Sequence, residues 1–441
     1  MKLHAEHAWL GDRVAADVLI EIAGERFVRI TPGVPAPPDA ERLPGLTLPG
    51  MANVHSHAFH RALRGRVQAG RGTFWTWRTH MYEVAARLDP DSYLALARTV
   101  YAEMALAGIS CVGEFHYVHH GPGGTPYADP NAFGEALLQA AREAGIRITL
   151  LDACYLTGGI GRELEGPQLR FGDGTADAWA DRVSELRADG HARIGAAIHS
   201  VRAVPGDQIR TVAQWARQRR APLHVHLSEQ PAENEACLET YGVTPTRLLA
   251  DKRALGGRTV AVHATHLTAE DIGLLGASQS GVCMCPTTER DLADGIGPAR
   301  DLVAAGSPLS LGSDQHAVID LFEEARAVEL DERLRTRKRG HWTAGELLAA
   351  ATCNGHSALG WPEAGRIEPG SYADLVTVDL NSVRLAGAAP GHLAESAVFA
   401  AAPADIRHVM VSGNQIVRDG RHLLIDDVPT ALSQAIVALT D

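Results

Sequence analysis

Residues 46–57 read LTLPGMANVHSH, an apolar run that ends in two histidines one residue apart. Seven more short apolar runs follow, separated by longer stretches with helical character that are rich in Ala, Leu, Arg and Glu. Eight strand–helix repeats in about 300 residues predict a (β/α)8 TIM-like barrel rather than an open sheet. The eight predicted strands are 46–54, 110–115, 146–153, 193–198, 222–227, 259–262, 281–285 and 308–311.

Most of these runs end in a side chain that can take part in chemistry. In a (β/α)8 barrel, the loops at the carboxyl ends of the strands form the pocket. We therefore expect the polar residues at these ends to converge on one site. They are His55, His57, His116, His199, His226, His263 and Asp314.

The two ends of the chain show a different pattern. Residues 1–48 and 365–425 hold short apolar runs broken by Gly and Asp, and Ser-Gly-Asn at 412–414 is a hairpin turn signal. Because both ends lack long helical periodicity, we expect them to pair into one small domain. We predict a small β-sandwich domain over 1–49 plus 364–427, a barrel over 50–363 and a C-terminal helix over 428–441.

The composition excludes several classes of protein. The 441 residues include 41 Lys and Arg against 53 Asp and Glu, a net charge of −12 that suits neither nucleic acid nor an anionic membrane. We find neither the apolar segment of a signal peptide nor a run long enough to span a membrane. The six cysteines are too sparse for a disulfide framework. We expect a cytoplasmic protein without nucleic-acid or membrane partners.

Four predicted strand ends carry groups that bind metal ions. Residues i and i+2 of a strand face the same side, so His55 and His57 can offer two imidazoles to one ion. His226 and His263 end the fifth and sixth strands, and Asp314 follows the eighth. Each alone could be an ordinary structural residue, but together they indicate a site for zinc, iron or a similar metal.

The same residues suggest a reaction. Glu229, three residues after His226, could work first as a general base and then as a general acid toward a leaving nitrogen. Asp314 could accept a proton from the metal-bound water, and His263 could orient the hydroxide. This set suits hydrolysis at an sp2 carbon that bears an amino or imino group, with ammonia as the leaving group. A structural hydrogen bond is the alternative role of Glu229.

The order of these residues resembles that of the amidohydrolase superfamily, and the flanking LPGM at 48–51 and GRIEPGSYADLV at 365–376 agree with it. The fourth predicted strand lacks the lysine or acid with which binuclear members bridge two ions. We therefore expect one divalent metal ion, Zn2+ by default with Fe2+ as the alternative. The resemblance implies His263 beside the metal-bound water and, as metal ligands, His55, His57, His226 and Asp314.

Two arginines suggest the substrate. Arg78 and Arg202 follow the first and fourth predicted strands and would face one pocket, where a small dicarboxylate could use both guanidinium groups. Surface ion pairs are the alternative for each arginine. The motifs WTWR at 75–78, FHYVHH at 115–120, HSVR at 199–202 and CPTTE at 285–289 resemble the formimidoylglutamate deiminase family. That family hydrolyses N-formimino-L-glutamate to N-formyl-L-glutamate and ammonia in histidine degradation, with Glu as the proton shuttle.

The resemblance implies Arg78 and Tyr117 at one substrate carboxylate, and His199 and Arg202 at the other. His60 stands where the family has a glutamine that helps to hold a carboxylate. The resemblance also implies a homodimer. A deaminase of an aromatic or heterocyclic amine, such as guanine, cytosine or adenosine, is the alternative function. His266 and His316 are further candidates for contacts behind the metal ligands.

Overall fold

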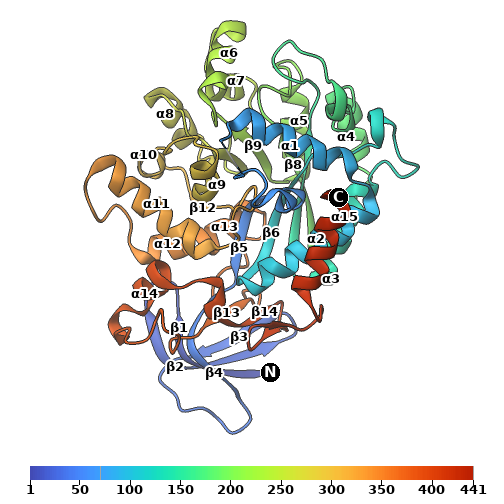
Figure 1. Ribbon diagram of the computed structural model, residues 1–441. Coiled ribbons are helices and arrows are strands. Elements are labelled where there is room, and N and C mark those ends of the chain that lie inside the picture. The colour runs from blue at the N-terminus through green and yellow to red at the C-terminus, as the bar shows by residue number, and fades with distance from the viewer. Residues whose placement is uncertain (70, 441) are drawn as a thin grey trace.

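The computed structural model describes residues 1–69 and 71–440, and these form two sheets of eight strands each (Figure 1). One sheet is parallel and follows the chain order, which is the strand order of a (β/α)8 barrel. Its strands are β5 (Met51–Ser56), β6 (Ile109–His116), β7 (Arg147–Cys154), β8 (Ala192–Ile198), β9 (Leu223–Leu227), β10 (Thr259–His263), β11 (Gly281–Met284) and β12 (Leu309–Leu311).

Helices lie outside the parallel sheet (Figure 1). The second of them begins where Asp89 accepts a hydrogen bond from the Ser92 amide at 2.7 Å and Pro90 takes the first helical position. The helices are α1 (Phe74–Arg87), α2 (Pro90–Leu106), α3 (Ala132–Ala144), α4 (Ala176–Val183), α5 (Ile209–Arg219), α6 (Pro231–Tyr241), α7 (Pro245–Asp251), α8 (Ala269–Ala277), α9 (Pro286–Asp291), α10 (Ala299–Ala305), α11 (Leu321–Thr336), α12 (Ala344–Ala351), α13 (Cys353–Ala358), α14 (Leu393–Ala400) and α15 (Val428–Thr440). Short 3-10 helices cover Ala58–Leu63, Pro122–Gly124, Gly166–Arg170, Pro390–His392 and Pro403–Asp405.

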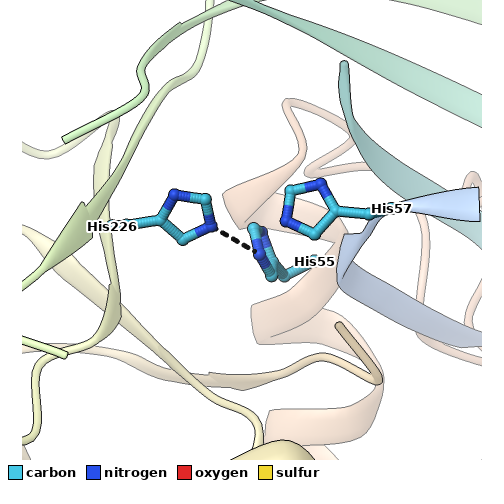
Figure 2. A group of neighbouring side chains, drawn as sticks. All are labelled: His55, His57 and His226. Atoms are coloured by element: carbon cyan, nitrogen blue, oxygen red, sulfur yellow. Dashed lines mark hydrogen bonds between the residues drawn. The ribbon is translucent and has the colours of Figure 1, made fainter. Parts of the chain in front are cut away.

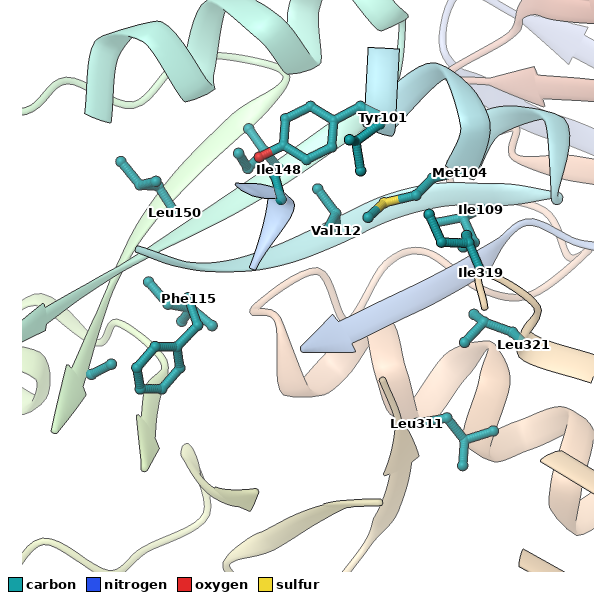
Figure 3. Packing of buried hydrophobic residues seen from close by; sticks show 14 of the residues in the cluster. Tyr101, Met104, Ile109, Val112, Phe115, Ile148, Leu150, Leu311, Ile319 and Leu321 are labelled. Atoms are coloured by element: carbon teal, nitrogen blue, oxygen red, sulfur yellow. The ribbon is translucent and has the colours of Figure 1, made fainter. Parts of the chain in front are cut away.

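The main hydrophobic core lies between the helices and the outer face of the barrel. Figure 3 shows Tyr101 and Met104 of α2 beside Val112 of β6, within one cluster of buried side chains. Ile148 of β7 belongs to the same cluster. Removing side chains of this size from water stabilises a fold by about 1.5–3 kcal/mol each, so this cluster fixes the helices against the strands.

The barrel closes between its first and last strands. The continuous ladder ends at β5 on one side and β12 on the other, and an isolated bridge joins Ser56 to Asp314. The Asp314 amide donates to the His55 carbonyl at 2.9 Å, and the His57 amide donates to the Asp314 carbonyl at 3.2 Å. We call these contacts the closing seam, and they lie among residues that the sequence selects as metal ligands.

The second sheet is built from both ends of the chain, as Figure 1 shows in blue and red. β4 pairs with β13 in antiparallel fashion and thereby joins the two ends. The sequence predicts a turn at 412–414, and the structure forms it with Ser412 and Gly413, which have positive φ angles of 48° and 76° and separate the paired residues Val411 and Asn414. The strands are β1 (Lys2–Trp9), β2 (Val14–Ala23), β3 (Arg26–Thr31), β4 (Glu41–Pro49), β13 (Leu375–Val378), β14 (Ile406–Val411), β15 (Asn414–Arg418) and β16 (Arg421–His422).

The predicted architecture of a barrel plus a second β unit from both termini is confirmed, and each of the eight predicted runs overlaps a barrel strand. The first run, 46–54, differs because it spans the end of β4 and the start of β5. Gly50 divides the two strands, and a Cβ there would lie 2.5 Å from Ser110 Oγ. The proposed domain boundaries stay predictions, and Asp441 lies outside the described residues. Within 1–69 and 71–440, no helix has the length and apolar character that crossing a membrane requires.

A buried ion pair ties the barrel to the second sheet. Arg147 of β7 donates from Nη1 to Asp374 Oδ1 at 2.9 Å and also from Nη2 to Oδ2, and both side chains are almost fully buried. Asp374 also accepts a hydrogen bond from the Ser412 amide at 2.8 Å. Tyr372 lies beside the guanidinium, with its ring centroid 4.8 Å away.

We expect Asp374→Ala to lower the free energy of unfolding by about 3–5 kcal/mol, because it leaves a buried guanidinium without its partner. The exposed pair Arg247–Asp251 provides the control, and Asp251→Ala should cost at most about 1 kcal/mol. Urea unfolding followed by circular dichroism measures both changes. Equal effects of the two substitutions would contradict this role of the buried pair.

Candidate active site

Three histidines meet at the carboxyl ends of β5 and β9. Figure 2 shows the rings of His55, His57 and His226 pointing toward one another. The Nε2 atoms of His226 and His55 are 3.0 Å apart, and one ring nitrogen of each histidine lies within 4.8 Å of the others. All three side chains are buried. The structure therefore brings together the three histidines expected to bind metal.

Asp314 joins this cluster from the loop after β12. Its Oδ1 atom lies 3.4 Å from His55 Nε2 and 3.4 Å from His57 Nε2. Although burial opposes ionisation, the contact with His55 and the nearby histidines lower the pKa of Asp314 far below its ordinary value. Asp314 has a φ of 44°, a strained conformation that the closing seam holds in place.

The ring nitrogens are arranged for metal binding. The Nδ1 atoms of His57 and His226 donate to the carbonyls of Phe115 and His199, each at 2.8 Å, so their Nε2 lone pairs face the cluster. Burial, followed by the charge of His55, lowers the pKa of His57 to about 3, which keeps the imidazole neutral. Three neutral imidazoles and a carboxylate form a donor set that fits Zn2+ or Fe2+.

A polar network behind the ligands links the two strands of the seam. Asn53 donates from Nδ2 to Ser313 Oγ at 2.7 Å and accepts from the Ser313 amide at 2.9 Å. His316 lies between Ser313 Oγ, at 2.9 Å, and Ser56 Oγ, at 3.1 Å. Ser56 donates to Glu114 at 2.6 Å, and burial raises the pKa of Glu114 to about 7. His316 thus supports the ligand-bearing backbone, whereas sequence analysis missed the roles of Asn53 and Glu114.

Glu229 and His263 lie next to the histidine cluster. His263 Nε2 is 3.9 Å from Glu229 Oε1 and 3.7 Å from Asp314 Oδ2, and its Nδ1 is 3.3 Å from Glu289 Oε1. Burial disfavours the charged form of His263, but Glu229, Glu289 and Asp314 together raise its pKa well above the ordinary value. Burial also raises the pKa of Glu229, which suits a carboxyl group that gains and loses a proton. Glu289 is a further residue whose position behind His263 sequence analysis did not predict.

A cavity of about 570 Å³ opens beside the cluster. Glu229, His263 and Asp314 line it together with the ligand residues His57 and His226. Its wall also contains every residue that sequence analysis assigned to substrate binding. These are His60, Arg78, Tyr117, His199 and Arg202.

One side of this cavity is formed by His60, Tyr117 and Arg78. His60 Nε2 lies 2.8 Å from the Tyr117 hydroxyl, and Arg78 donates from Nε to the Tyr82 hydroxyl at 2.6 Å. Burial, followed by the charge of His57, lowers the pKa of His60 well below its ordinary value, so a neutral imidazole replaces the expected glutamine. Arg78 belongs to the first turns of α1 rather than to a loop.

Arg202 is already paired with carboxylates of the protein. Its Nε donates to Glu233 Oε2 at 2.8 Å, and its Nη2 lies 3.5 Å from Glu229 Oε2. His199 packs beside Tyr155, with ring centroids 4.3 Å apart. Glu233 is not predicted from the sequence, because nothing in the local pattern distinguishes it from a solvated acid at the start of a helix.

A second group of potential ligands, His116, His119 and Asp152, lies outside this cavity. Asp152 accepts hydrogen bonds from Trp179 at 2.9 Å and from Arg182 at 2.8 Å. Because the Arg182 guanidinium already neutralises the Asp152 carboxylate, we interpret this group as a structural network rather than a metal site. His266 lies on the loop after β10, where its backbone amide donates to the Ser228 carbonyl at 3.0 Å.

The chain is similar to known proteins along its whole length. A family model described as the amidohydrolase family matches residues 46–416. The formimidoylglutamate deiminase of Pseudomonas aeruginosa is 38% identical, with 100% of this chain and 99% of that protein covered. The 8-oxoguanine deaminase of the same species is 31% identical, with coverages of 85% and 83%. The crystal structure of an amidohydrolase from Brucella melitensis has a TM-score of 0.92 at 34% identity, covering 100% of both chains.

We expect wild-type protein to retain about one equivalent of zinc after dialysis, because the cluster offers one set of three imidazoles and a carboxylate. His226→Ala should lose this zinc, whereas His224→Gln should retain it. His224 lies on the same strand but contacts the Ala358 carbonyl, with its Nε2 3.2 Å away. Elemental analysis of the dialysed proteins, together with the zinc-dependent shift in Tm, makes the comparison. Zinc retention by His226→Ala equal to that of wild type would contradict the site.

Proposed function

Because the chain belongs to the amidohydrolase family, we propose that it hydrolyses N-formimino-L-glutamate to N-formyl-L-glutamate and ammonia, a step of histidine degradation. The protein is a hydrolase, and the 38% identity to a formimidoylglutamate deiminase spans nearly the full length of both chains. The observation that carries the proposal is a cavity that adjoins the histidine cluster and includes both Arg78 and Arg202. A small substrate with two carboxylates could use these two guanidinium groups, whereas a neutral base would not.

In this proposal, His55, His57, His226 and Asp314 hold a single divalent ion, Zn2+ by default and Fe2+ as the alternative. Such an ion would supply activated water at neutral pH, because coordination lowers the pKa of water from about 15.7 to about 7. The proposed single ion is consistent with the fourth strand, which offers no lysine or acid: β8 reads ARIGAAI.

The proton transfers are assigned to Glu229. Its carboxylate lines the cavity and lies 3.9 Å from His263 Nε2. Glu229 takes one proton from the attacking water as general base and delivers it to the imino nitrogen as general acid. Asp314 Oδ2, which lies 3.7 Å from His263 Nε2, takes the second proton of that water as the C–N bond breaks. This proton passes through Glu229 to the same nitrogen, which leaves as ammonia while the oxygen becomes the formyl carbonyl. His263 orients the attacking oxygen.

We assign the two carboxylates of the substrate to the two parts of the cavity that contain an arginine. Arg78 and Tyr117, with His60 beside them, hold one carboxylate. His199 and Arg202 hold the other. Glu233 holds Arg202 at Nε, and Nη2 lies 3.5 Å from Glu229 Oε2, so the substrate carboxylate would approach the guanidinium from its Nη1 side. A homodimer remains a prediction from the resemblance, and a cytoplasmic location remains a prediction from the composition and the sparse cysteines.

Ammonia release from N-formimino-L-glutamate, measured beside guanine, cytosine and adenosine on protein of known metal content, tests the proposal. We expect ammonia only with N-formimino-L-glutamate. Deamination of one of the bases, without release from the formimino compound, would replace the proposal by its alternative.

We expect Glu229→Gln to lower kcat by about 10²-fold or more, because the amide cannot exchange a proton with the leaving nitrogen. Metal content should stay unchanged, since Glu229 is not among the proposed ligands. Steady-state kinetics and elemental analysis of the same preparation provide both values. Unchanged turnover would remove Glu229 from the mechanism.

A further inference from the structure

Glu233 is a buried carboxylate that the mechanism above does not use. It lies in the first turn of α6, it borders the cavity, and only 1% of its surface is exposed. Both of its oxygens are engaged: Oε1 accepts from the Ser228 amide at 2.8 Å, and Oε2 accepts from Arg202 Nε at 2.8 Å. The Glu233 side chain therefore contacts both Arg202, the proposed substrate-binding arginine, and the backbone of Ser228, which precedes Glu229.

The first contact fixes the backbone that leads from His226 to Glu229. Ser228 has a φ of 50°, in the left-handed region that is unfavourable for a residue other than glycine. The hydrogen bond from its amide to Glu233 helps to offset this cost, and its carbonyl accepts from the His266 amide at 3.0 Å. Since Ser228 directly precedes Glu229, its conformation determines the direction in which the Glu229 side chain leaves the chain.

The second contact fixes the orientation of Arg202. The guanidinium is shared by two carboxylates, because Nη2 also lies 3.5 Å from Glu229 Oε2. While Glu233 holds Nε, the plane of the guanidinium is set and Glu229 stays within 3.9 Å of His263. Of the two carboxylates that contact Arg202, loss of Glu233 would leave Glu229. The guanidinium would then attract the Glu229 side chain away from His263.

We propose that Glu233 is a positioning residue for the reaction: it holds Arg202 and the Ser228 backbone at once, and so directs the substrate arginine and the proton-transferring Glu229 into the cavity together. The identity of the substrate rests on the function proposed above. The effect on Glu229 does not, because it concerns proton transfer to whichever leaving group the enzyme accepts.

Glu233→Gln tests this role, since the amide keeps the size of the side chain but presents an NH2 group to one of the two donors. We expect kcat to fall about tenfold or more and KM to rise about tenfold, because small displacements of catalytic groups have effects of this order. Glu239→Gln, an exposed substitution on the same helix, should leave both values within about twofold of wild type. Steady-state kinetics at fixed metal content measure them.

Double mutants separate a positioning role from general damage. If Glu233 acts through Arg202, Glu233→Gln should raise KM in wild type but not in an Arg202→Met background. If it acts through Glu229, it should lower kcat in wild type but change kcat by less than about twofold in a Glu229→Gln background. The proposal would be overturned if Glu233→Gln changed kcat and KM by the same factors in both double mutants as it does in wild type. It would also be overturned if Glu233→Gln alone had the kcat and KM of wild type.

Two controls keep the outcome interpretable. Should Glu233→Gln fail to fold, Glu233→Asp repeats the test, because it keeps the charge but withdraws it by one methylene; we expect a smaller loss of kcat with the same pattern in the double mutants. The wild-type substrate panel is run first. Activity only on guanine, cytosine or adenosine would contradict the proposed function. In that case the kcat of Glu233→Gln relative to wild type, measured on that base, would still support or overturn the role of Glu233.

Discussion

The closing seam between β5 and β12 is the constraint on which both the fold and the site depend. The Asp314 amide and carbonyl pair with the backbone of His55 and His57, so the contacts that complete the barrel also deliver a carboxylate to two imidazoles. Asn53 and Ser313 reinforce these contacts from behind the ligands. A change that opened the seam would therefore separate the Asp314 carboxylate from the two imidazoles.

The cavity combines buried charges of both signs in a chain whose net charge is −12. Arg202 is shared between Glu229 and Glu233, and His263 is shared among Glu229, Glu289 and Asp314. Charges that are this deeply buried persist only when they are paired, so each group constrains the position of the next. In the proposed mechanism, proton transfer and substrate binding would thereby depend on one connected set of residues.

The sequence predicts the fold well because two local signals reinforce each other. Short apolar runs alternate with helical stretches, and the runs end in His or Asp where a barrel collects its functional groups. The division of the run 46–54 into β4 and β5 is not visible in its apolar pattern, because the close approach of Ser110 to Gly50 is a tertiary contact. Asn53, Glu114 and Glu233 escaped detection for the same reason: their partners are determined by the packing of other segments, not by the local pattern.

Crystals of zinc-loaded protein, measured just above and just below the zinc absorption edge, test the central claim most directly. We predict one anomalous peak per chain, about 2.0–2.2 Å from ring nitrogens of His55, His57 and His226 and from an oxygen of Asp314. A second peak of equal height in the same cavity would contradict a single-metal site. A peak held by other residues, or none in protein that is fully active, would contradict the account as a whole.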